Sequence, residues 1–129
     1  MKEIAIKTSA RNGIIDITAK VEEVVSKAKV KDGLCNIFCP HTTAGLIINE
    51  NADFSVKEDI LMKLNKLVPD NDDYTHTEGN SPAHIKSCLV GVSLDIPVKD
   101  GKLILGMWQG LFFAEFDGPR SRKVIVSII

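Results

Sequence analysis

The residues best suited to chemistry in this 129-residue chain are its three histidines, His41, His76 and His84. Histidine titrates near neutral pH and is the commonest metal ligand among the side chains. His76 and His84 lie in the longest polar stretch, residues 72–84, and His41 lies in a second polar interruption, residues 40–45. Three imidazoles with an open fourth position form a known catalytic zinc arrangement. This placement predicts that the fold brings the three rings to one divalent ion.

The alternative is that each histidine is a solvated or hydrogen-bonded loop residue. The sequence contains no His-x-x-x-His pair and no helical histidine–glutamate pair that would support a metal site. Seven residues separate His76 from His84, which is too many for a local chelate. A metal site would therefore depend on tertiary contacts.

Two carboxylates, Glu115 and Asp117, lie two positions apart on a predicted strand, so both face the same side. Such a pair can hold a divalent ion or act as acid and base. The alternative is a polar strand edge neutralised by Arg120. Against this alternative, Glu115 lies in the apolar run 111–116, and a carboxylate in such surroundings usually has a partner.

Arg120, Arg122 and Lys123 form the one dense basic cluster of the chain. The planar fork of arginine matches the geometry of phosphate and carboxylate groups, so the cluster predicts a small anionic substrate. Residues 42–45, Thr-Thr-Ala-Gly, are suited to line an anion pocket with hydroxyls and backbone amides, although they do not form a Walker motif.

The elements that must position these residues follow from hydrophobic periodicity. Helices are expected to begin at Thr18, Ser55 and Ser81, the last with Pro82 in its first turn. Ser55 and Glu58 have the spacing of a capping box. Hairpins are expected around Asn12–Gly13 and around Asp100–Gly101. Strands are expected at residues 2–8, 14–17, 34–39, 44–48, 92–98, 102–105, 110–116 and 123–129.

This pattern places each histidine where an element begins or ends. His41 follows a strand, His76 lies in a loop of eleven residues, 70–80, and His84 lies in the first turn of a helix. Loops of this length usually have a function. The pattern gives seven or eight strands and three helices without an internal repeat or linker, which predicts a single domain, residues 1–129.

Composition excludes several classes of protein. Sixteen basic against seventeen acidic residues leave a net charge of −1, which argues against a nucleic-acid partner. No apolar run is long enough to cross a membrane, and the N-terminus does not read as a signal peptide, so we expect a cytoplasmic protein without a membrane partner. Cys35, Cys39 and Cys88 form no Cys-x-x-Cys motif, and we expect them to be small buried hydrophobes.

Several motifs in order along nearly the whole chain resemble the YjbQ-like family. These motifs are His41–Leu46, Asn49–Asp53, Tyr74–His76, Asn80–His84, Gly101–Gln109 and Glu115–Arg120. The resemblance implies an α+β fold, with a β-sandwich-like antiparallel sheet of about seven or eight strands and three helices to one side, and a homotrimer. It also implies the poorly established activity of a secondary thiamine-phosphate synthase, which joins a pyrimidine diphosphate to a thiazole phosphate. Pro82 departs from many members, which have another small residue there.

The resulting hypothesis is a small enzyme with a divalent metal ion, zinc or magnesium, that acts on an anionic metabolite. The alternative is a non-catalytic module that binds a small phosphorylated or carboxylated metabolite. The residues are assigned as follows: His41, His76 and His84 to the metal; Glu115, Asp117 and Arg120 to catalysis; Thr42, Thr43, Asn80 and Arg120 to substrate binding.

Overall fold

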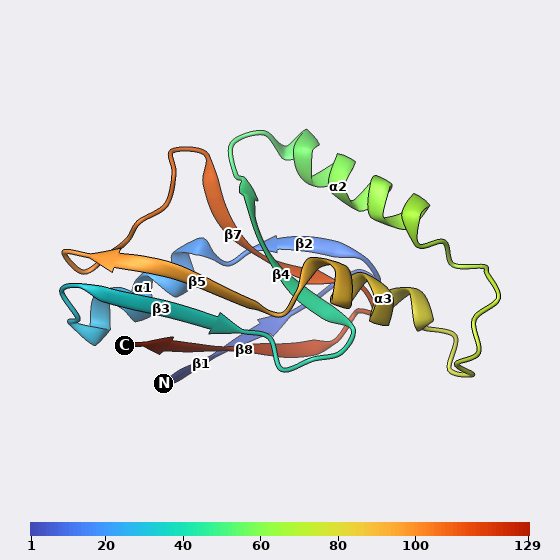
Figure 1. Ribbon diagram of the computed structural model, residues 1–129, viewed down its shortest axis with the longest axis horizontal. Helices are drawn as coiled ribbons and strands as arrows, with labels where there is room; N and C mark the ends of the chain where they lie inside the picture. The colour runs from blue at the N-terminus through green and yellow to red at the C-terminus, as the bar shows by residue number, and fades with distance from the viewer.

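Two antiparallel β-sheets form the scaffold of the computed structural model, which describes residues 1–129 (Figure 1). The five-stranded sheet has the order β1-β8-β3-β5-β6, and the three-stranded sheet has the order β2-β7-β4. The strands are β1 (Lys2–Lys7), β2 (Gly13–Asp16), β3 (Gly33–Phe38), β4 (Ala44–Glu50), β5 (Ser93–Lys99), β6 (Lys102–Leu103), β7 (Gln109–Glu115) and β8 (Ser121–Ile128). The helices are α1 (Thr18–Ala28), α2 (Phe54–Leu67) and α3 (Ser81–Val90). The predicted α+β fold in a single domain is therefore confirmed.

One of the two predicted hairpins is present. Asp100 and Gly101 have φ angles of 51° and 73°, the positive values that a two-residue hairpin turn requires, and they join β5 to β6. The prediction of a hairpin around Asn12–Gly13 is wrong. Neither residue has a positive φ angle, and the chain crosses there from one sheet to the other, so β1 pairs with β8 whereas β2 pairs with β7.

The three helices begin close to the predicted residues, but two caps differ. The carboxylate of Asp53 caps α2 by accepting a hydrogen bond of 2.9 Å from the Ser55 backbone N–H, so Ser55 is not the cap. Asn80 is the N-cap residue of α3, one position before the predicted Ser81. Gly91 ends α3 with a φ angle of 89°, a value that glycine adopts without strain.

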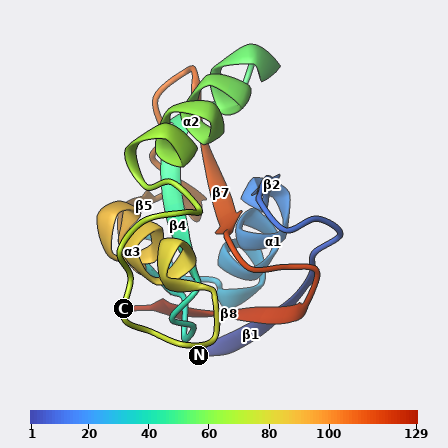
Figure 2. The same cartoon turned by 90° about the vertical axis from the view of Figure 1, so that its right-hand side faces the viewer.

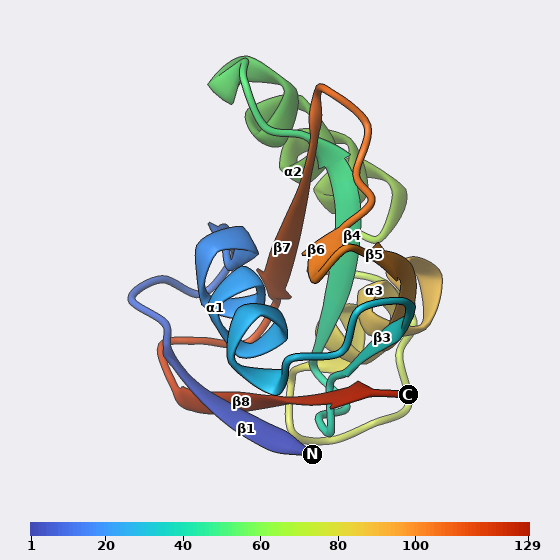
Figure 3. The ribbon, with the colours of Figure 1, turned by 90° about the vertical axis from the view of Figure 1, so that its left-hand side faces the viewer.

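Alternation along β7 divides the interior into two apolar layers. Leu111 and Phe113 face the main core, which lies between the two sheets and includes Val21 and Val25 of α1. Ala114 faces the opposite side, where α2 and α3 pack. The helices thus cover both faces of the β2-β7-β4 sheet and do not lie together on one side, as the views in Figures 2 and 3 show.

Cys35 and Cys39 are buried as predicted, but Cys88 is exposed because α3 turns it away from the sheet, so the prediction is wrong for this residue. None of the helices combines the length and the apolar character needed to cross a membrane.

Candidate functional site

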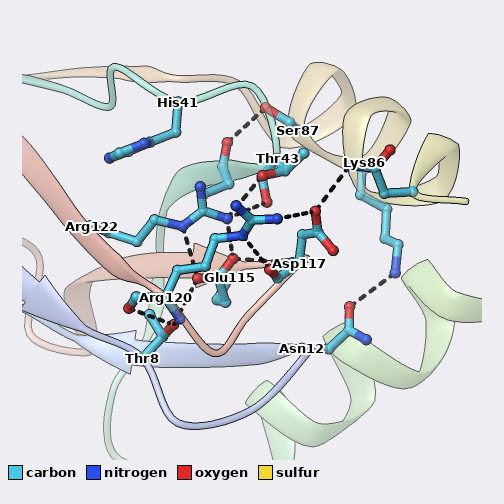
Figure 4. Close-up of polar contacts among 12 residues, drawn as sticks. Thr8, Asn12, His41, Thr43, Lys86, Ser87, Glu115, Asp117, Arg120 and Arg122 are labelled. Atoms are coloured by element: carbon cyan, nitrogen blue, oxygen red, sulfur yellow. Dashed lines mark hydrogen bonds and ion pairs between the residues drawn. The ribbon is translucent and has the colours of Figure 1, made fainter. Parts of the chain in front are cut away.

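A buried ion pair joins the two sheets at one end of the molecule (Figure 4). Glu115 is the last residue of β7 and Arg122 belongs to β8. Arg122 donates from Nε to Oε1 of Glu115 at 2.8 Å and from Nη2 to Oε2, which makes the contact bidentate. Nη2 also donates to the Thr43 hydroxyl at 2.8 Å. The two side chains are only 5% and 1% exposed, so the pair is almost entirely out of solvent.

The Glu115 carboxylate has further partners besides Arg122. The Thr8 hydroxyl donates to Oε1 at 2.8 Å, and the Asp117 backbone N–H donates to Oε2 at 3.0 Å. Burial alone raises the pKa of Glu115, but the bonds from Arg122, Asp117 and Thr8 outweigh burial and hold this pKa below its usual value. A Cβ on Gly118 would lie 2.8 Å from Glu115 Cγ, so only glycine fits there. Glu115 is therefore ionised and fully occupied by internal contacts.

Asp117 and Arg120 form a second, more exposed ion pair beside the first. Arg120 donates from Nη2 to Asp117 Oδ2 at 3.0 Å and from Nε to the Asp117 carbonyl at 2.7 Å. Asn80 donates to the same Oδ2 at 2.9 Å, while its own Oδ1 is buried without a partner. The Arg120 side chain is 54% exposed against 18% for Asp117. One edge of the guanidinium is thus fixed while Nη1 stays free.

A polar cavity of about 350 Å³ lies over both ion pairs, and no large apolar side chain lines it. Seven of the nine residues predicted for the site line this cavity. They are His41, Thr42, Thr43, Asn80, His84, Asp117 and Arg120. Glu115 is bonded to Arg122, which also lines the cavity, and His76 lies outside it. The structure therefore brings most of the predicted residues together.

The structure brings the three histidines together only in part. Lys123 of β8 donates its backbone N–H to His41 Nε2 at 3.1 Å, so this ring nitrogen is engaged. The rings of His76 and His84 lie edge to face, with centroids 5.4 Å apart. His84 shares one cavity with His76 and others with His41. No group of three or more His, Cys, Asp or Glu side chains is placed to hold a metal ion, and the predicted zinc or magnesium ion stays a prediction.

The surroundings of His41 lower the pKa of its imidazole ring. Burial lowers its pKa, and the nearby Arg122 guanidinium lowers it further, against the opposing effect of the Lys123 carbonyl oxygen, which lies 3.2 Å from Nε2 and can accept a hydrogen bond from the protonated ring. His41 is accordingly neutral at pH 7 and can accept a proton only in more acidic solution.

Contacts on both sides of α3 hold in place the helix that carries His84 to the wall of the polar cavity. The Ser87 hydroxyl donates to the Ala44 carbonyl at 2.6 Å, which ties α3 to the start of β4. Lys86 is only 2% exposed and donates from Nζ to Asn12 at 3.0 Å, as Figure 4 shows. The same Nζ donates to Asn65 of α2 at 2.6 Å. The helix that carries His84 is therefore anchored to β4, to α2 and to the β1–β2 connection.

Sequence reasoning missed two residues that organise the site, Arg122 and Thr8. Arg122 was visible as part of a basic cluster, and its spacing from Val124 and Val126 is the period of two that marks one strand face. Since those valines are buried, an arginine on the same face must be buried and paired. No comparable signal marks Thr8.

Comparisons of sequence agree on one group of proteins. The family model described as "UPF0047 protein YjbQ-like" matches residues 2–129. The UPF0047 protein MJ1081 of Methanocaldococcus jannaschii is 59% identical over 124 residues, covering 96% of this chain and 90% of that protein. The UPF0047 protein YugU of Bacillus subtilis is 45% identical over 130 residues, covering 100% and 98%.

Solved structures give the same result for the fold. An uncharacterized conserved protein of the YjbQ/UPF0047 family from Clostridium acetobutylicum has a TM-score of 0.98 at 54% identity, with 100% of both chains covered. A YbjQ-like protein of unknown function from Sulfolobus solfataricus has a TM-score of 0.95 at 35% identity, covering 98% of this chain and 94% of that one.

Proposed function

The chain belongs to the UPF0047 YjbQ-like family, and on this basis we propose that its polar cavity binds the phosphate or carboxylate group of a small metabolite. The family resemblance inferred from the motifs is confirmed. The observation that carries the proposal is the half-exposed Arg120, whose guanidinium is held on one edge by Asp117 and is free at Nη1. An arginine oriented in advance loses less conformational entropy when it binds an anion.

The two arginines have different roles in this proposal. Arg122 is neutralised by Glu115 and buried, so it supports the floor of the cavity. Arg120 shares its charge with Asp117 but faces solvent, so it supplies the positive charge that an incoming anion meets. Thr42 is exposed at the cavity wall, where its hydroxyl can donate to an anionic oxygen.

Transfer chemistry is the second candidate, because His41 and His84 line the same cavity as Arg120. The candidate reaction is the one implied by the resemblance, in which the ring nitrogen of a thiazole phosphate bonds to the carbon of a pyrimidine diphosphate that carries the diphosphate, and pyrophosphate departs. The protonated form of an imidazole beside the leaving group can donate a proton to the departing pyrophosphate, and Arg120 can offset its negative charge. Glu115, with all its contacts made internally, is better suited to positioning than to proton transfer.

Binding of inorganic pyrophosphate, measured by isothermal titration calorimetry, tests the first proposal. The Arg120→Ala variant should bind about tenfold or more weakly than the wild type, because one charge-assisted contact is lost. Arg11→Ala is the matched control, since Arg11 is also 54% exposed and paired with an aspartate, Asp70, but lies outside the cavity. Equal affinity of wild type and Arg120→Ala would contradict the proposal.

Turnover of the pyrimidine diphosphate and the thiazole phosphate separates catalysis from binding. If the protein is an enzyme, the His84→Gln variant should lose turnover but keep a pyrophosphate affinity within about twofold of that of the wild type. Turnover at background in the wild type, together with normal pyrophosphate binding, would leave a binding module as the function.

The homotrimer is also a proposal. Leu34 and Phe38 are 38% and 41% exposed, and they lie on the outer face of β3 in the five-stranded sheet. Apolar side chains on an uncovered sheet face are suited to contact another copy of the chain. Sedimentation velocity should give the mass of three chains, and a Phe38→Lys variant should shift it toward one.

A further inference from the structure

A groove of about 590 Å³ lies between α1 and the strands β1 and β8, away from the polar cavity. Figure 3 shows α1 above these two strands. The groove is lined by the beginning of β1 and the end of β8, whereas Thr8 and Arg122 of the polar site lie at the opposite ends of the same strands. The groove and the polar cavity share no residue, so they are separate sites.

The sheet wall of the groove is the margin of the main core. Ile4 of β1 and Val126 and Ile128 of β8 line it. Alternation along the strands puts these side chains on the face that also carries the buried Ile6 and Val124. Val126 is 1% exposed, but Ile4 and Ile128 are only partly buried. The core layer therefore stays open to solvent at this margin.

The helix wall of the groove is a stripe of α1 beside its buried face. Val21 and Val25 belong to the main core, whereas Lys20, Val24 and Ala28 follow each other at intervals of four residues and line the groove. Val24 is partly buried and Ala28 is exposed. The small side chain of Ala28 leaves space that a larger one would fill.

The charged side chains of the groove leave a surplus of positive charge. Both of its acidic residues are neutralised by lysines. These ion pairs are Glu23–Lys27 at 2.7 Å and Glu3–Lys123 at 3.3 Å. Lys2 and Lys20 also line the groove, and neither forms an ion pair. An apolar surface thus lies beside two unpaired ammonium groups.

We propose that this groove is a second binding site, for a small apolar molecule that ends in a carboxylate. Cavities that bind small molecules have volumes of about 300–1,000 Å³, mostly apolar walls and a few polar groups that orient the ligand. The apolar part of the ligand covers the open margin of the core, and its carboxylate meets Lys2 and Lys20. Most of the affinity comes from the apolar contact, because ion pairs at an exposed surface contribute little.

Octanoate, butanoate and octanamide are the probes, with affinities measured by isothermal titration calorimetry. Octanoate should bind about tenfold or more tightly than butanoate, because four more methylene groups leave water. It should also bind about two- to fivefold more tightly than octanamide, which has the same chain without a charge.

The Lys2→Gln/Lys20→Gln double variant should lose this preference for octanoate over octanamide, because both unpaired charges are removed. Lys7→Gln is the matched control, since Lys7 is an exposed, unpaired lysine of β1 that lies outside the groove. This control should keep the wild-type preference.

Ala28→Trp should fill the groove and weaken octanoate binding about tenfold or more. Ala19→Trp is the matched control, because Ala19 is also an exposed alanine of α1 but does not line the groove. Both variants should bind pyrophosphate within about twofold of the wild type, since neither residue lines the polar cavity.

A second measurement needs no variant. In amide NMR spectra of the wild type, octanoate should shift the signals of Val24, Ala28 and Val126, which line the groove. It should leave the signals of Thr42 and Asn80, which line the polar cavity, unchanged.

Several results would overturn the proposal. Absence of octanoate binding to the wild type, or equal octanoate affinity of Ala28→Trp and Ala19→Trp, would show that the groove is not the site. Equal affinity of the wild type for octanoate and octanamide would rule out recognition of the carboxylate. A lower mass in sedimentation velocity for Ala28→Trp, but not for Ala19→Trp, would show that a second copy of the chain covers the groove instead.

Discussion

Arg122 of β8 binds Glu115 of β7 through two hydrogen bonds, although the two strands belong to different sheets. The pair therefore closes one end of the space between the sheets and also forms the floor of the polar cavity. The same contact serves stability and the geometry of the site. Removal of this contact should therefore change both the free energy of unfolding and the geometry of the site, and the two effects can be measured separately.

Breaking this pair should be costly because one charge would be left buried alone. Glu115→Met should lower the free energy of unfolding by about 3–5 kcal/mol, as measured by urea denaturation. The Glu115→Met/Arg122→Met double variant should be more stable than the single variant, since no unpaired charge remains. A single variant as stable as the double one would contradict this account.

The stability contributed by Glu115 should depend on pH. Its pKa is below the usual value in the folded state, so its contribution is complete above the unfolded pKa of about 4.3 and is lost as pH falls through the folded pKa. The difference in unfolding free energy between wild type and Glu115→Gln should therefore narrow as pH is lowered from about 5. A difference that is the same at every pH would show that the carboxylate charge is not involved.

Gly45→Ala should displace α3 from β4, because the added Cβ meets the Gly91 carbonyl oxygen and the Val90 side chain. We expect a loss of about 1–3 kcal/mol in unfolding free energy, as measured by urea denaturation. Gly13→Ala is the control, since nothing lies within 4 Å of its added Cβ and its φ angle is not positive. Unchanged stability of Gly45→Ala would show that α3 can shift freely.

His41 should titrate below pH 6.5, because burial and Arg122 both disfavour its charged form. A folded pKa below the unfolded one means that its contribution to stability is present above about pH 6.5 and is lost as pH falls through the folded pKa. Pyrophosphate affinity should rise over the same range, because an imidazolium adds positive charge to the cavity. The pKa can be measured by an NMR pH titration, in which the His41→Gln variant identifies the His41 signal. A His41 titration midpoint at or above about pH 6.5 would contradict the prediction.

Local patterns in the sequence were enough to predict most of the elements. The alternation and helical spacing of apolar residues depend on neighbours along the chain, so seven or eight strands and three helices were predictable, and eight and three are found. Polar stretches that interrupt apolar runs must lie at the ends of elements. For this reason the sequence alone marks His41, Asn80 and Arg120 as candidates, and the structure places all three on one cavity.

Only the tertiary structure decided which strands pair and which polar groups meet. Alternation shows which residues of a strand share a face, but it does not identify the neighbouring strand, so the β1–β2 hairpin was wrongly predicted. The burial of Glu115 was evident from its apolar surroundings, whereas the choice of Arg122 as its partner required β7 and β8 to face each other across two sheets. The structure also places His76 outside the polar cavity. The sequence could not show this, because distances between loops depend on the packing of the elements that carry them.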